Sequence, residues 1–303
     1  MNKNIRTDLA LEVRESFEQD SVEIKGVILK EEFDKKNDIR TSIVEIKDEA
    51  GAKAMERDIG KYITIEASKM NNSDEDYNKP LSKTINKYLK TLIENKEYNN
   101  VLVVGLGNRD VTPDALGPEV IDNLFITRHI INEFGDEFKS KNKLGNVSAI
   151  SPGVMAQTGM EAVEIIKGII KETKPDLIIV VDALASRSVK RLNTTVQLTN
   201  TGISPGSGVG NNRKAINKSS TGVDVIAIGV PTVVDAATIV SDTLTQYMEK
   251  FNYEENDIYQ FINDINENAI FNMFVTPKDI DESIKRISFT ISEALNSCFS
   301  TIS

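Results

Sequence analysis

The strongest fold signal in the chain is the stretch VLVVGLGN, residues 101–108. Its four consecutive apolar residues end in a glycine-rich turn, a pattern typical of a strand buried on both faces of a parallel sheet. Further apolar runs of strand length follow it, at 147–150, 176–182 and 225–229. Helices are expected between and after these runs, at about 114–129, at 158–170 and after Pro231. Strands that alternate with helices predict a three-layer α/β fold with a mostly parallel sheet and helices on both faces.

The regions on either side are expected to complete this fold. Apolar and polar residues partly alternate over 39–46 and 61–67, which predicts two further strands. An amphipathic helix is expected to open at Pro80, because proline is well tolerated in the first turn of a helix. The tail, about 256–297, has the pattern of two helices separated by residues 275–278.

The composition restricts the chemistry that is open to this protein. The chain has 303 residues with one histidine, His129, one cysteine, Cys298, and no tryptophan. A Ser-His-Asp or Cys-His mechanism would have to use His129, which is expected late in a helix, where it caps carbonyl groups. Cysteine and histidine cannot form a zinc site within one chain, whereas an oxygen-rich metal site stays possible. The single thiol excludes an intrachain disulfide, which fits a reducing cytoplasm.

Charge and hydropathy narrow the range of partners. The chain has 36 Lys and Arg against 46 Asp and Glu, which gives a formal net charge of −10. Direct binding to nucleic acid is not expected, because affinity for phosphates comes from clustered basic residues. The sequence has no apolar run of about 18 residues that could span a membrane, and its polar start lacks the core of a signal peptide. We expect a cytoplasmic protein.

Two carboxylates follow strands of the predicted parallel sheet, at the edge where sites of such sheets collect. Asp114 comes after the first apolar strand, and Asp182 closes the third. Two neighbouring carboxylates can share a proton, so that one acts as general base on a water molecule and the other as general acid. Each also has a structural interpretation: Asp114 as the N-cap of the next helix, and Asp182 as the partner of a cation such as Arg187.

The glycine-rich loops are weaker signals. The loop at 105–108 lacks the third glycine of a dinucleotide fingerprint, and the loop at 201–211 lacks the Gly-Lys-Ser/Thr end of a phosphate loop. The second loop suits a flexible contact with substrate, or a turn-rich connection. Backbone amides of the two loops are candidates to stabilise an oxyanion or to hold substrate, at Gly105, Gly107, Asn108, Gly206, Gly208 and Gly210.

Several long motifs occur in one order along the chain and together resemble the germination protease family. They are VGLGNRDVTPDALGP at 104–118, SPGVMAQTG at 151–159, VVDALASRS at 180–188, TGISPGSGVGNNR at 201–213 and AIGVPTVVDA at 227–236. IRTDLALE at 5–12 and VTPKDID at 275–281 also match. The resemblance covers about residues 5–250 and 274–297.

The resemblance implies an endopeptidase that initiates the degradation of small acid-soluble spore proteins during germination. It also implies a single α/β domain similar in fold to hydrogenase-maturation proteases, a homotetramer without cofactor or metal, and a location in the spore core. The two essential aspartates of the family map onto Asp114 of TPDALGP and Asp182 of VDALASR. Two departures are Arg109 in place of an aromatic residue and a shorter chain between the helix after Pro231 and residue 275.

The family is made as a zymogen that removes a short N-terminal propeptide by itself. Its cleavage sites have an acidic residue before the cut, then a hydrophobic residue and alanine. Thr7-Asp8-Leu9-Ala10 has this form, which predicts self-cleavage between Asp8 and Leu9. Residues 1–8 are then the propeptide, and 9–303 the peptidase domain. The alternative is an ordinary disordered start.

Two other functions are compatible with the sequence. One is a metal-dependent peptidase in which the same two aspartates are metal ligands. The other is a catalytically inactive protein whose glycine-rich loop binds a peptide or a phosphate.

Overall fold

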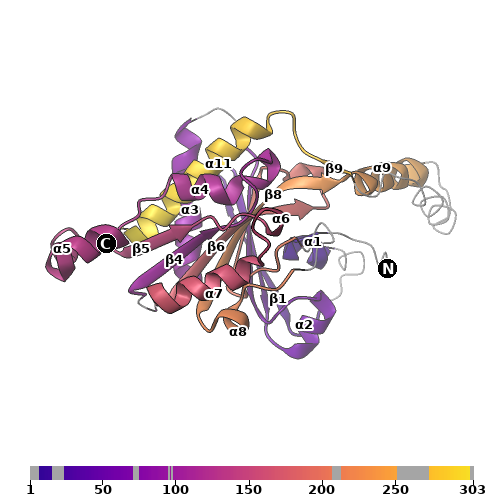
Figure 1. Cartoon of the computed structure of the whole chain (residues 1–303). Coiled ribbons are helices and arrows are strands. Elements are labelled where there is room, and N and C mark those ends of the chain that lie inside the picture. The colour runs from indigo at the N-terminus through magenta and orange to yellow at the C-terminus, as the bar shows by residue number, and fades with distance from the viewer. Residues whose placement is uncertain are drawn as a thin grey trace.

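The computed structural model describes residues 7–15, 24–70, 75–94, 96, 98–206, 213–250 and 273–300. Within these residues the chain forms a nine-stranded sheet with helices on both sides (Figure 1). The α/β class predicted from the sequence is confirmed. None of the helices in the described ranges is long and apolar enough to cross a membrane.

One half of the sheet is parallel, as the apolar runs predicted. It consists of β4 (Asn100–Gly105), β5 (Asn146–Ile150), β6 (Leu177–Ser186) and β8 (Asp224–Asp235). β4 pairs in parallel with β5 and with β6, and β6 pairs in parallel with β8. β6 and β8 are longer than predicted, because their pairing continues through Ser186 and Val234, past a register shift between Leu184 and Ala185. This long pairing places Asp182 within the paired part of β6 and not at its end.

The other half is antiparallel, so the sheet is mixed and not mostly parallel. Its strands are β1 (Val27–Asp34), β2 (Ile39–Ile46), β3 (Gly60–Ala67) and β7 (Thr195–Thr199), and the two-residue β9 (Phe274–Val275) pairs with β8. The full order is β1-β2-β3-β7-β8-β6-β4-β5. The strands expected at 39–46 and 61–67 are confirmed as β2 and β3. β7 joins the halves, because it is antiparallel to both β3 and β8.

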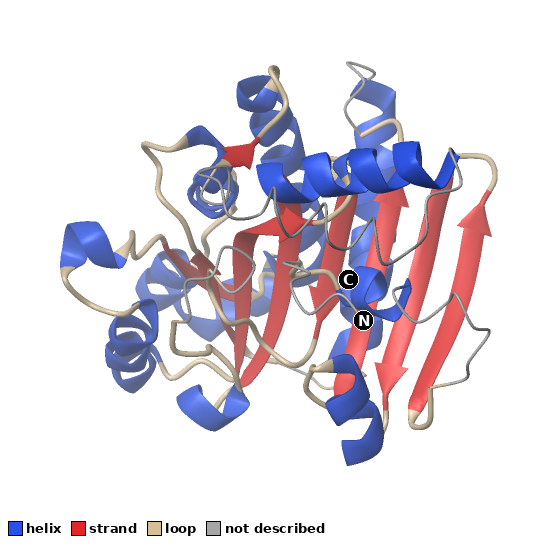
Figure 2. Cartoon of the chain, turned by 90° about the vertical axis from the view of Figure 1, so that its right-hand side faces the viewer, coloured by secondary structure: helices blue, strands red, loops and turns tan. Residues whose placement is uncertain are grey.

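Helices cover both faces, as predicted (Figures 1 and 2). On one face, α3 (Glu75–Ile93), α4 (Leu116–Asp122) and α11 (Ile280–Leu295) pack on the largest apolar cluster. On the other, α7 (Ala162–Thr173) packs on β4 and β6. Two short helices, α1 (Ala10–Glu15) and α2 (Glu49–Met55), pack on β2 and β3. The chain start is therefore fixed to the antiparallel half.

Several helix boundaries differ from the prediction. The helix expected at 114–129 is split into a 3₁₀ turn (Thr112–Asp114), α4, and α5 (Arg128–Lys141). His129 therefore lies in the first turn of α5 and cannot cap the carbonyl end of that helix. Thr158 ends α6 (Met155–Thr158) and does not begin a helix, because Gly159 follows it in the left-handed conformation with φ 70°.

Two further differences concern helix starts. α3 begins at Glu75, so Pro80 lies inside it and not at its start. α9 (Ala236–Lys250) follows β8 at Asp235, later than the helix expected after Pro231. Of the two tail helices, α11 is confirmed, and residues 251–272 lie outside the described ranges. The remaining short helix of the parallel half is α8 (Lys218–Thr221).

Candidate active site

Asp182 lies in the interior of the central strand β6, only 5% exposed. The strand continues to Ser186, so Asp182 does not close it, contrary to the sequence interpretation. Its Oδ1 accepts a hydrogen bond from the backbone N–H of Ala183 at 2.9 Å. Burial raises the pKa of Asp182 well above the usual carboxyl range, and the charges of Asp114 and Asp8 raise it further. Asp182 therefore holds a proton more readily than an ordinary carboxylate.

Asp114 reaches the site from the 3₁₀ turn that follows β4. Its Oδ2 accepts a hydrogen bond from the backbone N–H of Asn108 at 2.8 Å, and Thr232 on β8 donates to the carbonyl oxygen of Pro113 at 2.7 Å. The turn is thus held to the loop that follows β4 and to β8. Ala115 is the N-cap of α4 and the cap has no side-chain hydrogen bond, so the N-cap interpretation of Asp114 is wrong.

The two aspartates interact electrostatically, because the charge of Asp114 raises the pKa of Asp182. The pKa of Asp114 is itself raised by burial, and this rise is opposed by the Asn108 N–H and by the charge of Arg213. Arg213 also lowers the pKa of Asp182. Arg213, at the end of the 201–213 motif, is therefore a cation that acts on both aspartates, and the sequence did not identify it. A coupled pair of this kind can hold one proton between two carboxylates.

The segment predicted to contain the cleavage site is docked beside β6. The backbone N–H of Asp8 donates to the carbonyl oxygen of Ala185 at 3.0 Å, and the N–H of Ala185 donates to Oδ2 of Asp8 at 2.9 Å. Leu9 and Ala10 are 0% exposed. Asp8 lies close enough to Asp182 for its charge to raise the pKa of Asp182. The structure thus brings Asp8, Asp114 and Asp182 to one place.

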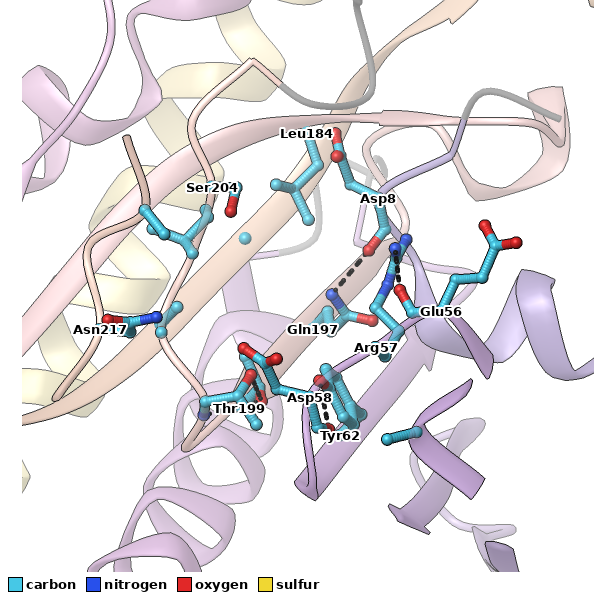
Figure 3. Close-up of a pocket in the computed structure, with 17 residues that line it drawn as sticks. Asp8, Glu56, Arg57, Asp58, Tyr62, Leu184, Gln197, Thr199, Ser204 and Asn217 are labelled. Carbon is cyan, nitrogen blue, oxygen red and sulfur yellow. Dashed lines mark hydrogen bonds between the residues drawn. The ribbon is translucent and has the colours of Figure 1, made fainter. Parts of the chain in front are cut away.

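Gln197 on β7 holds this segment from the side. Its Nε2 donates to the carbonyl oxygen of Asp8 at 3.2 Å, and its Oε1 accepts from the N–H of Ala10 at 2.7 Å. Figure 3 shows the bond between Gln197 and Asp8. Upstream, Arg57 donates from Nη2 to the carbonyl oxygen of Thr7 at 2.9 Å. Gln197 could not be identified from the sequence, because a single amide on a short strand has no motif of its own.

Helix α1 anchors the other end of the segment through a buried carboxylate, Glu12. Glu12 accepts hydrogen bonds from the backbone N–H groups of Arg187 at 2.8 Å and Ser188 at 3.0 Å, and from the hydroxyl of Thr7. Arg191 pairs with Glu12 at 3.3 Å and also binds Glu15 at 2.6 Å. These contacts connect α1 to the chain that follows Asp182.

The predicted oxyanion loop at 105–108 has a packing role in this structure. A β-carbon at Gly105 would lie 2.2 Å from the carbonyl oxygen of Gly117, so the glycine permits close contact between β4 and α4. The N–H of Asn108 is bonded to Asp114, and Gly107 lies directly against Asp114. In the second loop Gly206 has a positive φ of 73°, while Gly208 and Gly210 lie outside the described residues.

A cavity of about 470 Å³ lies beside the docked segment (Figure 3). Asp8 borders the cavity, whereas Asp114 and Asp182 are not among its lining residues. Asp8 thus lines the cavity, and its charge also acts on Asp182. The walls come from β7, from the end of β6 and from the loops around 57 and 204, with Arg57, Leu184, Gln197, Ser204 and Asn217 among the lining residues.

The other candidate groups lie elsewhere. Cys298 follows α11, and burial raises the pKa of its thiol to about 11, so little thiolate forms at neutral pH. In the described part of the chain, His, Cys, Asp and Glu side chains form no group of three or more that could hold a metal ion. The arrangement that remains is the buried Asp182 and the half-buried Asp114 beside a docked peptide segment.

Comparisons with known proteins point to one family. A family model described as germination protease matches residues 5–266. The germination protease of Caldanaerobacter subterraneus subsp. tengcongensis is 46% identical over 311 residues, which cover 96% of this chain and 93% of that protein. The germination protease of Bacillus subtilis strain 168 is 45% identical over 260 residues, 84% of this chain and 69% of that protein.

Among solved structures, the NiFe hydrogenase maturation protease HycI from Thermococcus kodakarensis KOD1 matches with a TM-score of 0.34 and 17% identity, over 69% of this chain and 99% of that chain. The family match and the relatives that span nearly the whole sequence carry the assignment. This chain belongs to the germination protease family and is a peptidase.

Proposed function

We propose that this protein is a spore endopeptidase that initiates the degradation of small acid-soluble proteins, with a water molecule activated by Asp114 and Asp182 as nucleophile. The observation that carries the proposal is the position of the Asp8–Leu9 segment. It is fixed by backbone hydrogen bonds beside β6, where the charge of Asp8 acts on Asp182. A peptide held against a coupled carboxylate pair is what hydrolysis by acid–base catalysis requires.

The surroundings of the two carboxylates favour different roles. Burial raises the pKa of Asp114, but the Asn108 N–H and the charge of Arg213 oppose this rise and it stays smaller than that of Asp182, so Asp114 is the general base. Asp182 is more deeply buried and has its pKa raised further, so it carries the proton and is the general acid. In the reaction Asp114 takes a proton from water as the water oxygen bonds to the scissile carbonyl carbon. Asp182 supplies the proton that the leaving amine needs when the C–N bond breaks.

The docked segment also supports a zymogen. Residues 1–8 are the propeptide and 9–303 the peptidase domain, and cleavage between Asp8 and Leu9 releases the propeptide from the aspartate pair. While Asp8 is held by Ala185 and Gln197, a separate substrate cannot occupy the same hydrogen-bonding positions. Self-cleavage therefore precedes activity on other proteins.

Family membership is what supports the proposed substrate, assembly and location. The natural substrates are small acid-soluble spore proteins, the active form is a homotetramer, and the enzyme works in the spore core. The net charge of −10 fits an enzyme that acts on DNA-coating proteins without binding the DNA itself.

Digestion of a purified small acid-soluble spore protein tests this proposal. Wild type, Asp114→Asn and Asp182→Asn are each assayed with and without a chelator, and circular dichroism confirms that the variants are folded. We expect cleavage by wild type in both conditions and none by either variant. An active Asp182→Asn protein would rule out the aspartate mechanism. Wild-type activity that is lost when the chelator is added would point to a metal-dependent peptidase. Wild-type protein that binds the substrate without cleaving it would point to an inactive binding protein.

A further inference from the structure

Gln197 contacts the docked segment on both sides of the bond between Asp8 and Leu9. Its Nε2 donates to the carbonyl oxygen of Asp8, which is the scissile carbonyl if cleavage occurs at this bond, at 3.2 Å. Its Oε1 accepts from the N–H of Ala10, two residues further on, at 2.7 Å. The second bond fixes which end of the amide faces Asp8, because only the oxygen can accept from Ala10. The donor is thus directed at the atom on which negative charge develops during hydrolysis.

The position of Gln197 is rigid. It lies on β7, which is paired on both sides, with Thr64 of β3 opposite it on one neighbour and Gly229 of β8 on the other. Its side chain is 7% exposed. A preorganised donor stabilises a developing oxyanion more than the neutral carbonyl, and a bond slightly long in the ground state shortens as charge builds.

We propose that Gln197 is a catalytic residue that stabilises the oxyanion formed on the carbonyl oxygen of Asp8, while its oxygen holds the peptide in register through Ala10. As the water oxygen bonds to the carbonyl carbon, the π electrons of the C=O bond move onto the oxygen and the Nε2–H bond strengthens. When the C–N bond breaks, the electrons return to re-form the C=O bond and the nitrogen of Leu9 leaves with a proton. This role rests on the cleavage proposed between Asp8 and Leu9.

The glycine-loop amides considered from the sequence are less suited to this role. The N–H of Asn108 is already bonded to Asp114, and Gly105 is paired with Val181 within the sheet. Gln197 has a donor that touches the carbonyl oxygen in question.

Self-processing of the intact chain, followed by mass spectrometry, measures the effect of Gln197. Gln197→Met keeps a similar volume and removes both hydrogen bonds. Gln197→Glu keeps an acceptor for Ala10 and removes the donor as long as the new carboxyl is ionised. We expect both variants to release residues 1–8 about 10²–10³-fold more slowly than wild type at neutral pH, the range found on removal of one oxyanion donor.

The pH dependence separates catalysis from a structural effect. A protonated carboxyl can donate a hydrogen bond, so the rate of Gln197→Glu relative to Gln197→Met should rise as the pH falls toward about 4.3, the ordinary pKa of glutamate. A merely structural role predicts a constant ratio. Thr195→Val is the matched control. Thr195 lies on the same face of β7, and its hydroxyl has no hydrogen-bond partner among the described residues, so wild-type processing is expected.

Parallel processing of Asp182→Asn separates the two proposals. If Asp182→Asn is inactive while Gln197→Met and Gln197→Glu process at the wild-type rate, the role of Gln197 is overturned and the aspartate mechanism stands. A wild-type cut at a bond other than Asp8–Leu9 also overturns it. Processing by Asp182→Asn at the wild-type rate overturns the proposed function itself. If Gln197→Met fails to fold, the processing rate of Gln197→Glu is compared with that of wild type across the pH range. Rates that change with pH in parallel contradict the proposal.

Discussion

The carbonyl oxygen of Asp114 occupies the place that a side chain at position 107 would need. A β-carbon on Gly107 would lie 1.9 Å from that oxygen and 3.2 Å from Oδ1 of the same aspartate. Gly107 also has a φ of 112°, which L side chains rarely adopt. The glycine of the GLGN loop therefore positions a carboxylate, and it does so by leaving room for the turn that carries Asp114.

Gly107→Ala should displace Asp114 and lower activity. The methyl group meets the backbone of residue 114, so the turn has to move, and the strained φ adds a cost of about 1–3 kcal/mol in folding free energy. We expect at least a tenfold loss of proteolytic rate with a folded protein, measured by substrate digestion and urea unfolding. Gly168→Ala is the control. Gly168 lies in α7 with nothing within 4 Å of its added β-carbon, and there alanine should raise stability by about 0.5–1 kcal/mol. Equal activity in both variants would contradict the positioning role.

Asp114→Asn should remove the general base. Loss of acid–base catalysis typically lowers the rate by about 10²–10⁴-fold. Asn can still accept the hydrogen bond from Asn108, so the turn should keep its shape. The matched control is Asp110→Asn on the same loop, where the carboxylate is exposed and, within the described part of the chain, accepts a 3.3 Å bond from Gln157. Steady-state cleavage rates should fall for Asp114→Asn and stay within twofold for Asp110→Asn. Comparable losses in both would show that loop charge, and not the buried base, matters.

The buried proton of Asp182 should make stability depend on pH. Its pKa in the folded protein is raised above the unfolded value of about 3.9, so its contribution to stability is intact below that pH and is lost as the pH rises through the raised pKa. Asp182→Asn avoids this loss. The Tm of the variant relative to wild type should therefore increase from pH 4 to pH 8.

Asp224 gives a control of opposite sign for this experiment. Hydrogen bonds from Lys218 and Lys96 lower the pKa of Asp224. Asp224→Asn should therefore lower the Tm most at neutral pH and least at acid pH. Thermal melts across the pH range measure both variants. A Tm difference for Asp182→Asn that does not change with pH would contradict the buried, protonated state.

The anchor of α1 should contribute strongly to stability. Glu12 has a side chain 3% exposed and pairs with Arg191, which is 12% exposed. Glu12→Ala leaves that guanidinium and the N–H groups of Arg187 and Ser188 without this acceptor, and loss of one partner of a buried ion pair costs about 3–5 kcal/mol. Urea unfolding measures the loss, and limited proteolysis should show faster cutting within residues 7–15. Glu32→Gln, which breaks an exposed pair with Lys87, should cost at most about 1 kcal/mol. If Glu12→Ala also lowered the free energy of unfolding by no more than about 1 kcal/mol, α1 would be held by apolar contacts.

The parallel half of the fold was predictable, because strands such as β4 are buried on both faces and show continuous apolar runs. The extent of β6 was not. A charged residue at 182 resembles a strand end, but residues 183–186 continue the strand because β8 pairs with them. That partner lies far away in sequence, so no local pattern reports it. β7 was missed for a similar reason: it has five residues, three of them with polar side chains, and so short a segment gives little signal, although it is buried between β3 and β8.

The candidate site was predictable in part. Asp114 and Asp182 were identified by their place after apolar runs, and the structure brings them into electrostatic contact. Arg213 and Gln197 were not identified. Their roles depend on the path of the loop that precedes Arg213 and on the docking of residues 7–10 against β7, both of which are tertiary contacts.

The most direct measurement of the central claim is the N-terminal mass of the intact chain after incubation at mildly acidic pH. If Asp114 and Asp182 hydrolyse the segment docked against them, wild type loses residues 1–8 and begins at Leu9, and Asp182→Asn keeps its full N-terminus under the same conditions. An Asp182→Asn chain that acquires the Leu9 terminus as fast as wild type would contradict the account.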